Sequence, residues 1–259
     1  MPSVNSVRYE VRDRVAEILL DSAPVNALNE AMIDEMLAAL RHAAQDDSVR
    51  AVILGSALPR RFCAGLRLDA LHGAPPARIY GLVDKLYNEL CDAQFNLGKP
   101  SIAAVCGTAR GGGMTLAISC DMIVAADTAT FGYPEIDVGL TPAIHYTHLP
   151  RVIGRHRAFD LLFTGRAFDA AEAMSLGLVS RVVPEQDVMR EARALAQTLC
   201  AKSPVVVKMG RKAFMRANDN DYRRGVAAAV ESFGNVVATD DAKEGIAAFV
   251  EKRKPSWQA

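Results

Sequence analysis

The sequence predicts a mixed α/β fold followed by a region made only of helices. Up to Val183, short apolar runs typical of strands alternate with amphipathic helical patterns. From Glu185 onward the apolar periodicity is helical throughout. This order is typical of a core covered by a helical cap. We therefore divide the chain into a core, residues 1–195, and a C-terminal helical region, residues 196–259.

The first elements follow from simple patterns. Runs at 4–11 and 15–20 predict strands with charged faces, and a buried strand is expected at 51–54. Asn29 is a suitable N-cap for the helix between them. The expected buried stripe of that helix is Met32, Ile33, Met36, Leu37 and Leu40.

The later elements are assigned in the same way. Residues 69–76 contain Gly73, Pro75 and Pro76 and predict a mobile loop, after which a helix is expected up to Leu97. A strand is expected at 122–126 and a loop at 130–142. The helices expected after Glu185 lie near 185–201, 204–217, 221–237 and 241–252.

Composition excludes several classes of protein. Half of the 259 residues are apolar, which is enough for a substantial core, and 30 basic residues balance 30 acidic ones. Neither a nucleic-acid partner nor a membrane partner is expected. The charged N-terminus does not resemble a signal peptide, and no Cys/His spacing indicates a metal site. The scattered cysteines indicate a reduced, cytoplasmic protein; they are Cys63, Cys91, Cys106, Cys120 and Cys200.

Two glycine-containing turns carry the functional information. Residues 101–106 predict a buried strand, Gly111 to Gly113 form a turn, and a helix begins after them. The first amides of a helix lack internal partners and favour negative charge. A second strand leads into the turn Cys63-Ala64-Gly65. Two such turns can supply two backbone amides to one carbonyl oxygen, although each alone is also an ordinary tight turn.

These segments resemble the enoyl-CoA hydratase/isomerase (crotonase) family. The matching segments are RRFCAGLRL at 60–68, KPSIAAVCGTARGGGMTLAISCD at 99–121, ATFGYPEIDVGLTP at 129–142, FTGRAFDAAEAMSLGLVSRVV at 163–183 and EGIAAFVEKRKPSW at 244–257. The resemblance implies an α/β, crotonase-like spiral of ββα turns with a C-terminal α-helical oligomerisation region. It also implies an acyl-CoA thioester substrate, no cofactor beyond the CoA of the substrate, and a homotrimer or homohexamer.

The resemblance also implies a set of catalytic residues. The amides of Leu66 and Gly112 would form an oxyanion hole for the enolate of the thioester, and Glu135 would transfer the proton. Hydratases of the family have a second glutamate where this chain has Thr115. A single carboxylate suits Δ3,Δ2-enoyl-CoA isomerisation, in which Glu135 moves a proton from C2 to C4. Alternatively, Glu135 is a solvated loop carboxylate.

Other reactions stay open at this point. The alternatives are an enoyl-CoA hydratase, another acyl-CoA reaction such as hydrolysis or decarboxylation, and a catalytically silent CoA-binding homologue. His145 and Tyr146 stand where similar hydratases have small residues. They are candidates for a narrowed pocket, and His145 for an acid–base role, unless it simply packs within a helix. Asp127 and Asp137 are further candidate carboxylates.

The predicted contacts with CoA are spread over both ends of the chain. Arg60, Arg61 and Arg67 flank the first turn and are expected to meet the phosphates, together with Ala64 in the turn itself. The resemblance adds Phe249 and Lys252 from the last helix. The alternatives are a solvated charged face for the cations and core or interface packing for Phe249.

Overall fold

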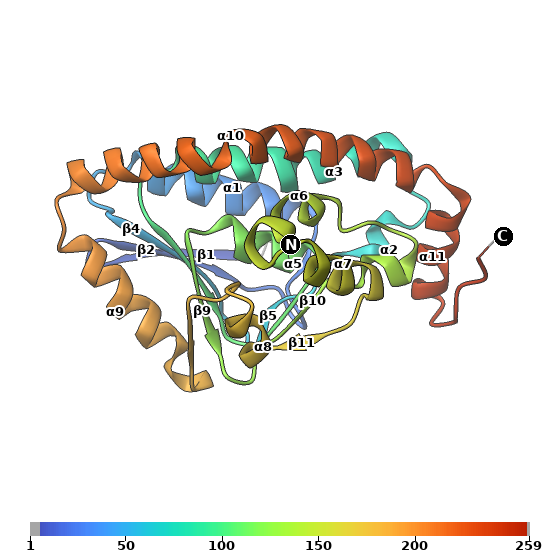
Figure 1. Cartoon of the computed structure of the whole chain (residues 1–259), viewed down its shortest axis with the longest axis horizontal. Helices are drawn as coiled ribbons and strands as arrows, with labels where there is room; N and C mark the ends of the chain where they lie inside the picture. The colour runs from blue at the N-terminus through green and yellow to red at the C-terminus, as the bar shows by residue number, and fades with distance from the viewer. Residues whose placement is uncertain (1–5, 258–259) are drawn as a thin grey trace, which may run out of the picture.

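The larger of two main sheets forms the centre of the molecule in the computed structural model, which describes residues 6–257 (Figure 1). Its strands follow the order β1-β2-β4-β7-β9-β12. Their bounds are β1 Val7–Arg12, β2 Val15–Leu20, β4 Ala51–Ser56, β7 Ser101–Val105, β9 Met122–Ala126 and β12 Arg181–Val183. β1 and β2 form an antiparallel hairpin, and all the other pairs are parallel. The short apolar runs of β4 and β7 fit this arrangement, because parallel strands are buried on both faces.

A second sheet accompanies the first, strand for strand. It follows the order β11-β10-β8-β5. Its strands are β5 Arg61–Cys63, β8 Thr108–Arg110, β10 Thr130–Gly132 and β11 Phe168–Asp169. The strand pairs β4/β5, β7/β8 and β9/β10 each place one strand in either sheet before the chain enters a helix. The backbone is therefore a spiral of ββα turns, with a small extra pair formed by β3 (Ala27–Leu28) and β6 (Gly65–Leu66).

Helices surround the two sheets. They are α1 Glu30–Gln45, α2 Leu68–Leu71, α3 Pro76–Asp84, α4 Leu90–Asn96, α5 Gly112–Ser119, α6 Ala143–Ile153, α7 Arg155–Thr164, α8 Ala170–Ser175, α9 Val188–Cys200, α10 Pro204–Val237 and α11 Asp240–Val250. The predicted start of α1 is confirmed, since the Asn29 side chain accepts a hydrogen bond from Met32 N at 2.9 Å. The stripe predicted for α1 is buried in full.

The structure corrects several predicted boundaries. The segment expected to be a loop at 69–76 contains most of α2 and the first residue of α3, because Leu71 is buried in the core. The loop expected at 130–142 contains β10 and a 3₁₀ turn, Pro134–Val138. The first predicted strand begins at Val7, and its residues 4 and 5 lie outside the described part of the chain.

The largest difference concerns the C-terminal region. The two helices expected at 204–217 and 221–237 are one helix, α10, which runs along the molecule above α1 and α3 (Figure 1). The boundary predicted at 195/196 falls inside α9, which packs on strands of the larger sheet. Whether the two parts are separate units stays a prediction. Among the described residues, no helix combines the length and apolar character needed to cross a bilayer.

Candidate active site

The two glycine turns pack against each other, backbone to backbone. Gly65 has a φ of +90°, and a Cβ on this residue would lie 2.8 Å from Arg110 O and 3.1 Å from Gly112 N. A Cβ on Gly113 would lie 2.3 Å from Cys63 O. A side chain at either position would force the turns apart. The sequence therefore brings Leu66, at the end of the first turn, next to Gly112, at the start of α5.

Gly112 begins α5, so its N–H has no acceptor within the helix. The preceding residue, Gly111, has a φ of 51° and a ψ of −118°, a conformation that essentially only glycine adopts. Gly111 also faces the third predicted group, because a Cβ there would lie 3.1 Å from Glu135 Oε1. The glycine thus brings the start of the helix and the carboxylate together.

Glu135 lies in the 3₁₀ turn after β10. Its Oε2 is buried and has no hydrogen-bond partner among the described residues. Burial raises the pKa of the Glu135 carboxyl from 4.5 to about 7. A buried carboxyl that keeps an unpartnered oxygen and a pKa near neutrality is suited to accept and return a proton. A solvated loop carboxylate would have neither property.

A cavity of about 510 Å³, here called the glycine-turn cavity, connects these groups. Of the predicted residues, it is lined by Ala64, Leu66, Arg67, Gly112, Glu135 and Phe249. Val25, Leu68, Leu140 and Phe233 make much of the remaining wall apolar. Such a wall, with few polar groups directed at one point, is typical of a small-molecule site.

The far wall of this cavity is formed by Leu86 and Tyr87. Both residues belong to a π-helical turn, Lys85–Glu89, that joins α3 to α4. Lys85 anchors the turn to α1 through contacts of 2.9 Å with both Glu30 and Asp34. Single π turns within helices are frequently found at functional sites. Here the turn directs two large side chains toward the proposed reacting centre.

Thr115, at the position of the second hydratase glutamate, faces a different partner. Its Oγ1 lies 3.3 Å from His145 Nε2, and both residues are buried. Burial lowers the pKa of His145 well below its usual value, and nearby His148 lowers it further. The ring of His145 also packs on Tyr133, with 4.5 Å between the ring centroids. His145 is therefore a neutral, packed residue, and neither it nor Thr115 lines the glycine-turn cavity.

Comparison with known proteins agrees with this geometry. The sequence pattern of the family described as enoyl-CoA hydratase/isomerase matches residues 10–259. The chain belongs to the enoyl-CoA hydratase/isomerase family. A probable enoyl-CoA hydratase of Mycobacterium bovis is 39% identical over 258 residues, which cover 95% of each chain. A short-chain enoyl-CoA hydratase of Clostridium acetobutylicum is 35% identical, with 97% of each chain covered.

Solved structures of this enzyme family share the fold. The crystal structure of an enoyl-CoA hydratase/isomerase from Pseudoalteromonas atlantica is 30% identical and covers 98% of this chain and 100% of its own, with a TM-score of 0.86. The predicted fold class, a crotonase-like spiral with a C-terminal helical region, is thereby confirmed. Membership in a family of enzymes also confirms that the chain is enzymatic in type.

The remaining predicted residues of this family member lie away from the glycine-turn cavity. Arg60 pairs with Glu185 at 3.5 Å on another face, and the Arg61 guanidinium donates to Arg60 O at 3.2 Å. Tyr146 stacks on Phe163, with 5.6 Å between ring centroids. Lys252 is exposed just beyond α11. Their roles, and the use of Arg67 by CoA, stay predictions.

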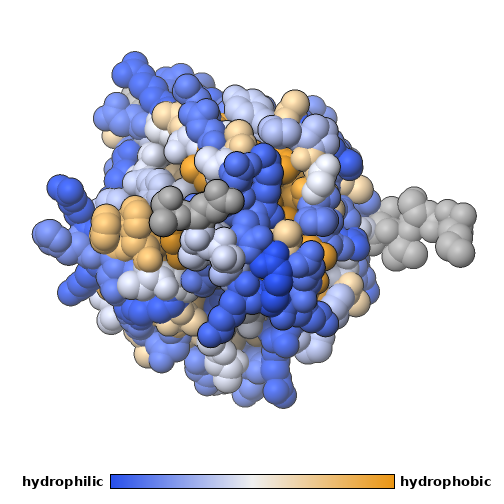
Figure 2. All heavy atoms as spheres, turned by 90° about the vertical axis from the view of Figure 1, so that its right-hand side faces the viewer, coloured by the Kyte–Doolittle hydropathy of each residue, from blue (hydrophilic) through white to orange (hydrophobic). Residues whose placement is uncertain are grey.

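The two further candidate carboxylates differ in position. Asp137 lines the glycine-turn cavity but is exposed, whereas Asp127 follows β9 and does not line it. The end of the molecule with α2 and α11, which contribute Leu68 and Phe249 to the cavity, is largely hydrophilic with small hydrophobic patches (Figure 2). A charged CoA handle would meet a surface of this kind.

Sequence analysis missed the wall of the cavity. Leu86 and Tyr87 lie in an apolar helical pattern that gives no sign of a π turn, and Phe233 is far away in the C-terminal region. The family resemblance was carried by glycines and by Glu135, which are local signals. Only a pattern spanning both halves of the chain would have indicated that α10 reaches the site.

Proposed function

We propose that this chain isomerises enoyl-CoA thioesters, with Glu135 as the single acid–base group. The observation that carries the proposal is the unpartnered, buried Glu135 Oε2 beside Gly111, with a pKa near 7. Glu135 takes a proton from C2 of a 3-enoyl-CoA, and the electron pair of that C–H bond moves into the enolate. Protonation at C4 by the same carboxyl leaves the double bond between C2 and C3 and restores the thioester.

The enolate needs a partner for its oxygen. We assign this role to the main-chain N–H groups of Leu66 and Gly112, which belong to the two packed turns. Amides held in place before the reaction stabilise a developing oxyanion without reorganisation, and loss of one such donor typically costs about a hundred- to a thousandfold in rate. The leucine side chain does not interfere, since only its amide takes part.

The absence of a second carboxylate beside Glu135 favours isomerisation over hydration. Hydration is best served by one group that orients water and another that exchanges a proton. Thr115 is instead engaged by the neutral His145. Of the other described carboxylates lining the cavity, Asp69 is paired with Arg67 at 3.1 Å and Asp137 is exposed. One proton shuttle is sufficient for a 1,3-shift.

Hydration of an enoyl-CoA is the second candidate, because the relatives quoted above are named hydratases. A direct assay separates the two reactions. With 3-hexenoyl-CoA, isomerisation creates the conjugated thioester and its absorbance rises; with crotonyl-CoA, hydration removes the conjugation and the absorbance falls. We expect the first activity to exceed the second, and Thr115→Glu to increase hydration. Faster hydration by the unaltered chain would assign it to the hydratases instead.

We further propose that the enzyme is a cytoplasmic homotrimer or homohexamer that uses no cofactor beyond the CoA of its substrate. Large apolar side chains are exposed on α7 and along the first half of α10. They are Phe159, Phe163, Val205, Val206, Met209 and Phe214. Exposed groups of this size commonly mark protein interfaces. Light scattering at micromolar concentration checks the assembly, and a monomer would contradict it.

A further inference from the structure

A second cavity of about 290 Å³ lies beside the glycine-turn cavity. Leu86 and Tyr87 of the π turn line both cavities. Thr115 lines the second one, three residues beyond Gly112 on α5 and therefore about 4.5 Å further along the helix axis. The second cavity thus begins where the part of an acyl chain beyond the reacting carbons would leave the first.

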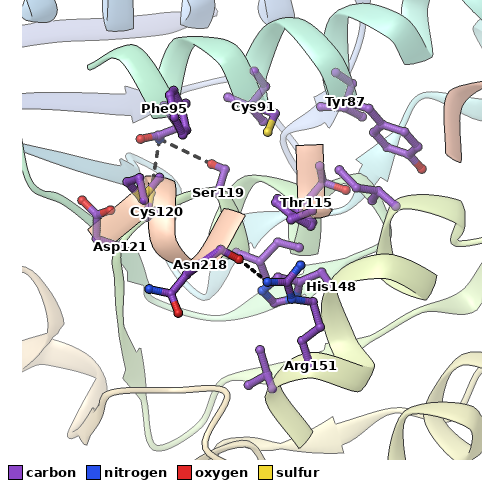
Figure 3. A pocket seen from close by; sticks show the side chains of 18 of the residues that line it. Tyr87, Cys91, Phe95, Thr115, Ser119, Cys120, Asp121, His148, Arg151 and Asn218 are labelled. Atoms are coloured by element: carbon purple, nitrogen blue, oxygen red, sulfur yellow. Dashed lines mark hydrogen bonds between the residues drawn. The ribbon is translucent and has the colours of Figure 1, made fainter. Parts of the chain in front are cut away.

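The second cavity is not simply a greasy pocket. Figure 3 shows Ser119, Cys120 and Asp121, at and just beyond the end of α5, on one side, and His148 and Arg151 of α6 on the other. Leu90 and Ile118 provide apolar wall. A chain entering past Tyr87 would therefore meet apolar groups and then a ring of polar ones.

Two polar atoms in this ring have no hydrogen-bond partner among the described residues. They are Oε1 of Gln94, a residue only 2% exposed, and Nδ1 of His148. Gln94 reaches its neighbours only through Nε2, at 3.4 Å from Ser119 Oγ and 3.6 Å from Cys120 Sγ. A buried polar atom left unpaired is costly, so each such atom in a native fold calls for a partner.

The chemistry of these atoms restricts what can pair with them. The amide oxygen of Gln94 only accepts hydrogen bonds, and the neutral imidazole of His148 offers one donor and one acceptor. Asp121 is already held by Arg211 at 2.8 Å and by Ser101 N at 2.8 Å. A terminal methyl group would pair with nothing here, and a carboxylate would face the Gln94 oxygen without a proton to donate. A hydroxyl group can donate to Gln94 and accept from His148.

We propose that the second cavity receives the far end of the acyl group, and that Gln94 and His148 select acyl chains that carry a hydroxyl group there. The inference rests on the proposed function only in requiring an acyl-CoA substrate; it does not depend on which reaction Glu135 performs. Gln94 and His148 are then specificity-determining residues at a distance from the reacting carbons.

Binding of unreactive, saturated thioesters tests the inference by isothermal titration calorimetry. The probes are octanoyl-CoA, 8-hydroxyoctanoyl-CoA, the mono-CoA ester of octanedioic acid, and butyryl-CoA, which is too short to reach Gln94. We expect the hydroxylated chain to bind about five- to tenfold more tightly than octanoyl-CoA. Gln94→Met, which keeps the length of the side chain, should remove most of this preference and leave butyryl-CoA binding unchanged. His148→Leu is the second variant.

The outcomes are distinguishable. Equal binding of the two eight-carbon monothioesters, or a preference that survives in both variants, overturns the inference and leaves the proposed function intact. Tighter binding of the carboxylate-ended chain also overturns it, in favour of recognition by Arg151. Failure of every CoA ester to bind would instead remove the proposed function itself.

Discussion

The two sides of the first turn of α5 treat their polar residues in opposite ways. On one side, Glu135 Oε2 is buried beside Gly111 without a partner, and its pKa is raised to about 7. On the other side, Thr115 lies 3.3 Å from a histidine that burial keeps neutral. Both sides are shielded from water, so the difference lies in pairing. A reactive carboxylate persists where the fold withholds a partner from it.

Glu135→Gln breaks the comparison most severely. The amide keeps the shape of the side chain but cannot take up the proton, so we expect isomerase kcat to fall about a hundred- to ten-thousandfold. Affinity for a saturated acyl-CoA should stay within about twofold, because the thioester contacts assigned here are backbone amides. His145→Ala is the control. If that variant lost all activity while Glu135→Gln retained it, the histidine side of the turn would carry the chemistry.

The pH dependence tests the same carboxylate without mutation. Glu135 acts as a base only when ionised, and its raised pKa places that ionisation near pH 7. Below this pH, kcat/KM should fall about tenfold for each unit, and above it a plateau is expected. Initial rates with 3-hexenoyl-CoA between pH 5 and pH 9 measure the profile. A midpoint near pH 4.5 would mean that the carboxyl is hydrated in solution.

Stability should carry the signature of the same group. The pKa of Glu135 is higher in the folded chain than its ordinary value of 4.5. The folded state therefore holds the proton more tightly, and this contribution to the free energy of unfolding is lost as pH rises from 4.5 to about 7. At pH 8, Glu135→Gln should increase the free energy of unfolding by about 2–3 kcal/mol, and at pH 4 by much less. Urea unfolding at both pH values measures the difference.

Thr115→Val sharpens the other side and is expected to affect activity least. The variant keeps the volume but leaves the buried Nε2 of His145 unpaired, which typically costs about 1–3 kcal/mol of stability. Isomerase kcat should change by less than about twofold, because the threonine hydroxyl lacks an activating base. Thermal unfolding and the 3-hexenoyl-CoA assay check both parts. A large loss of kcat with normal stability would place Thr115 in the reaction.

Local patterns predicted much of this molecule. The Asn29 cap and the buried stripe of α1 follow from short-range chemistry, and so does the turn at Gly111 to Gly113. The break predicted within α10 was wrong because the polar run at 218–221 favours a helix end, whereas packing of α10 against α3 and α6 holds the helix together. Tertiary contacts routinely override propensity in this way.

The site itself was predictable only in part. Glu135 and the two turns lie in short motifs, and the structure brings them to one cavity. Arg60 flanks the first turn in sequence, but its side chain pairs with Glu185 elsewhere, because neighbouring residues of a strand face opposite ways. The wall at Tyr87 and the pairing of Thr115 with His145 depend on contacts between distant segments. No local pattern encodes such contacts.

The close packing of the two glycine turns bears on how sequences of this kind should be interpreted. A Cβ at Gly113 would collide with Cys63 O, so this glycine is required for the chain to close its spiral, whatever the chain catalyses. A descendant that lost Glu135 would be compelled to retain the paired turns simply in order to fold. The glycine signature therefore dates from the architecture and is uninformative about turnover. When genomes are searched for working members, residue 135 should decide the assignment.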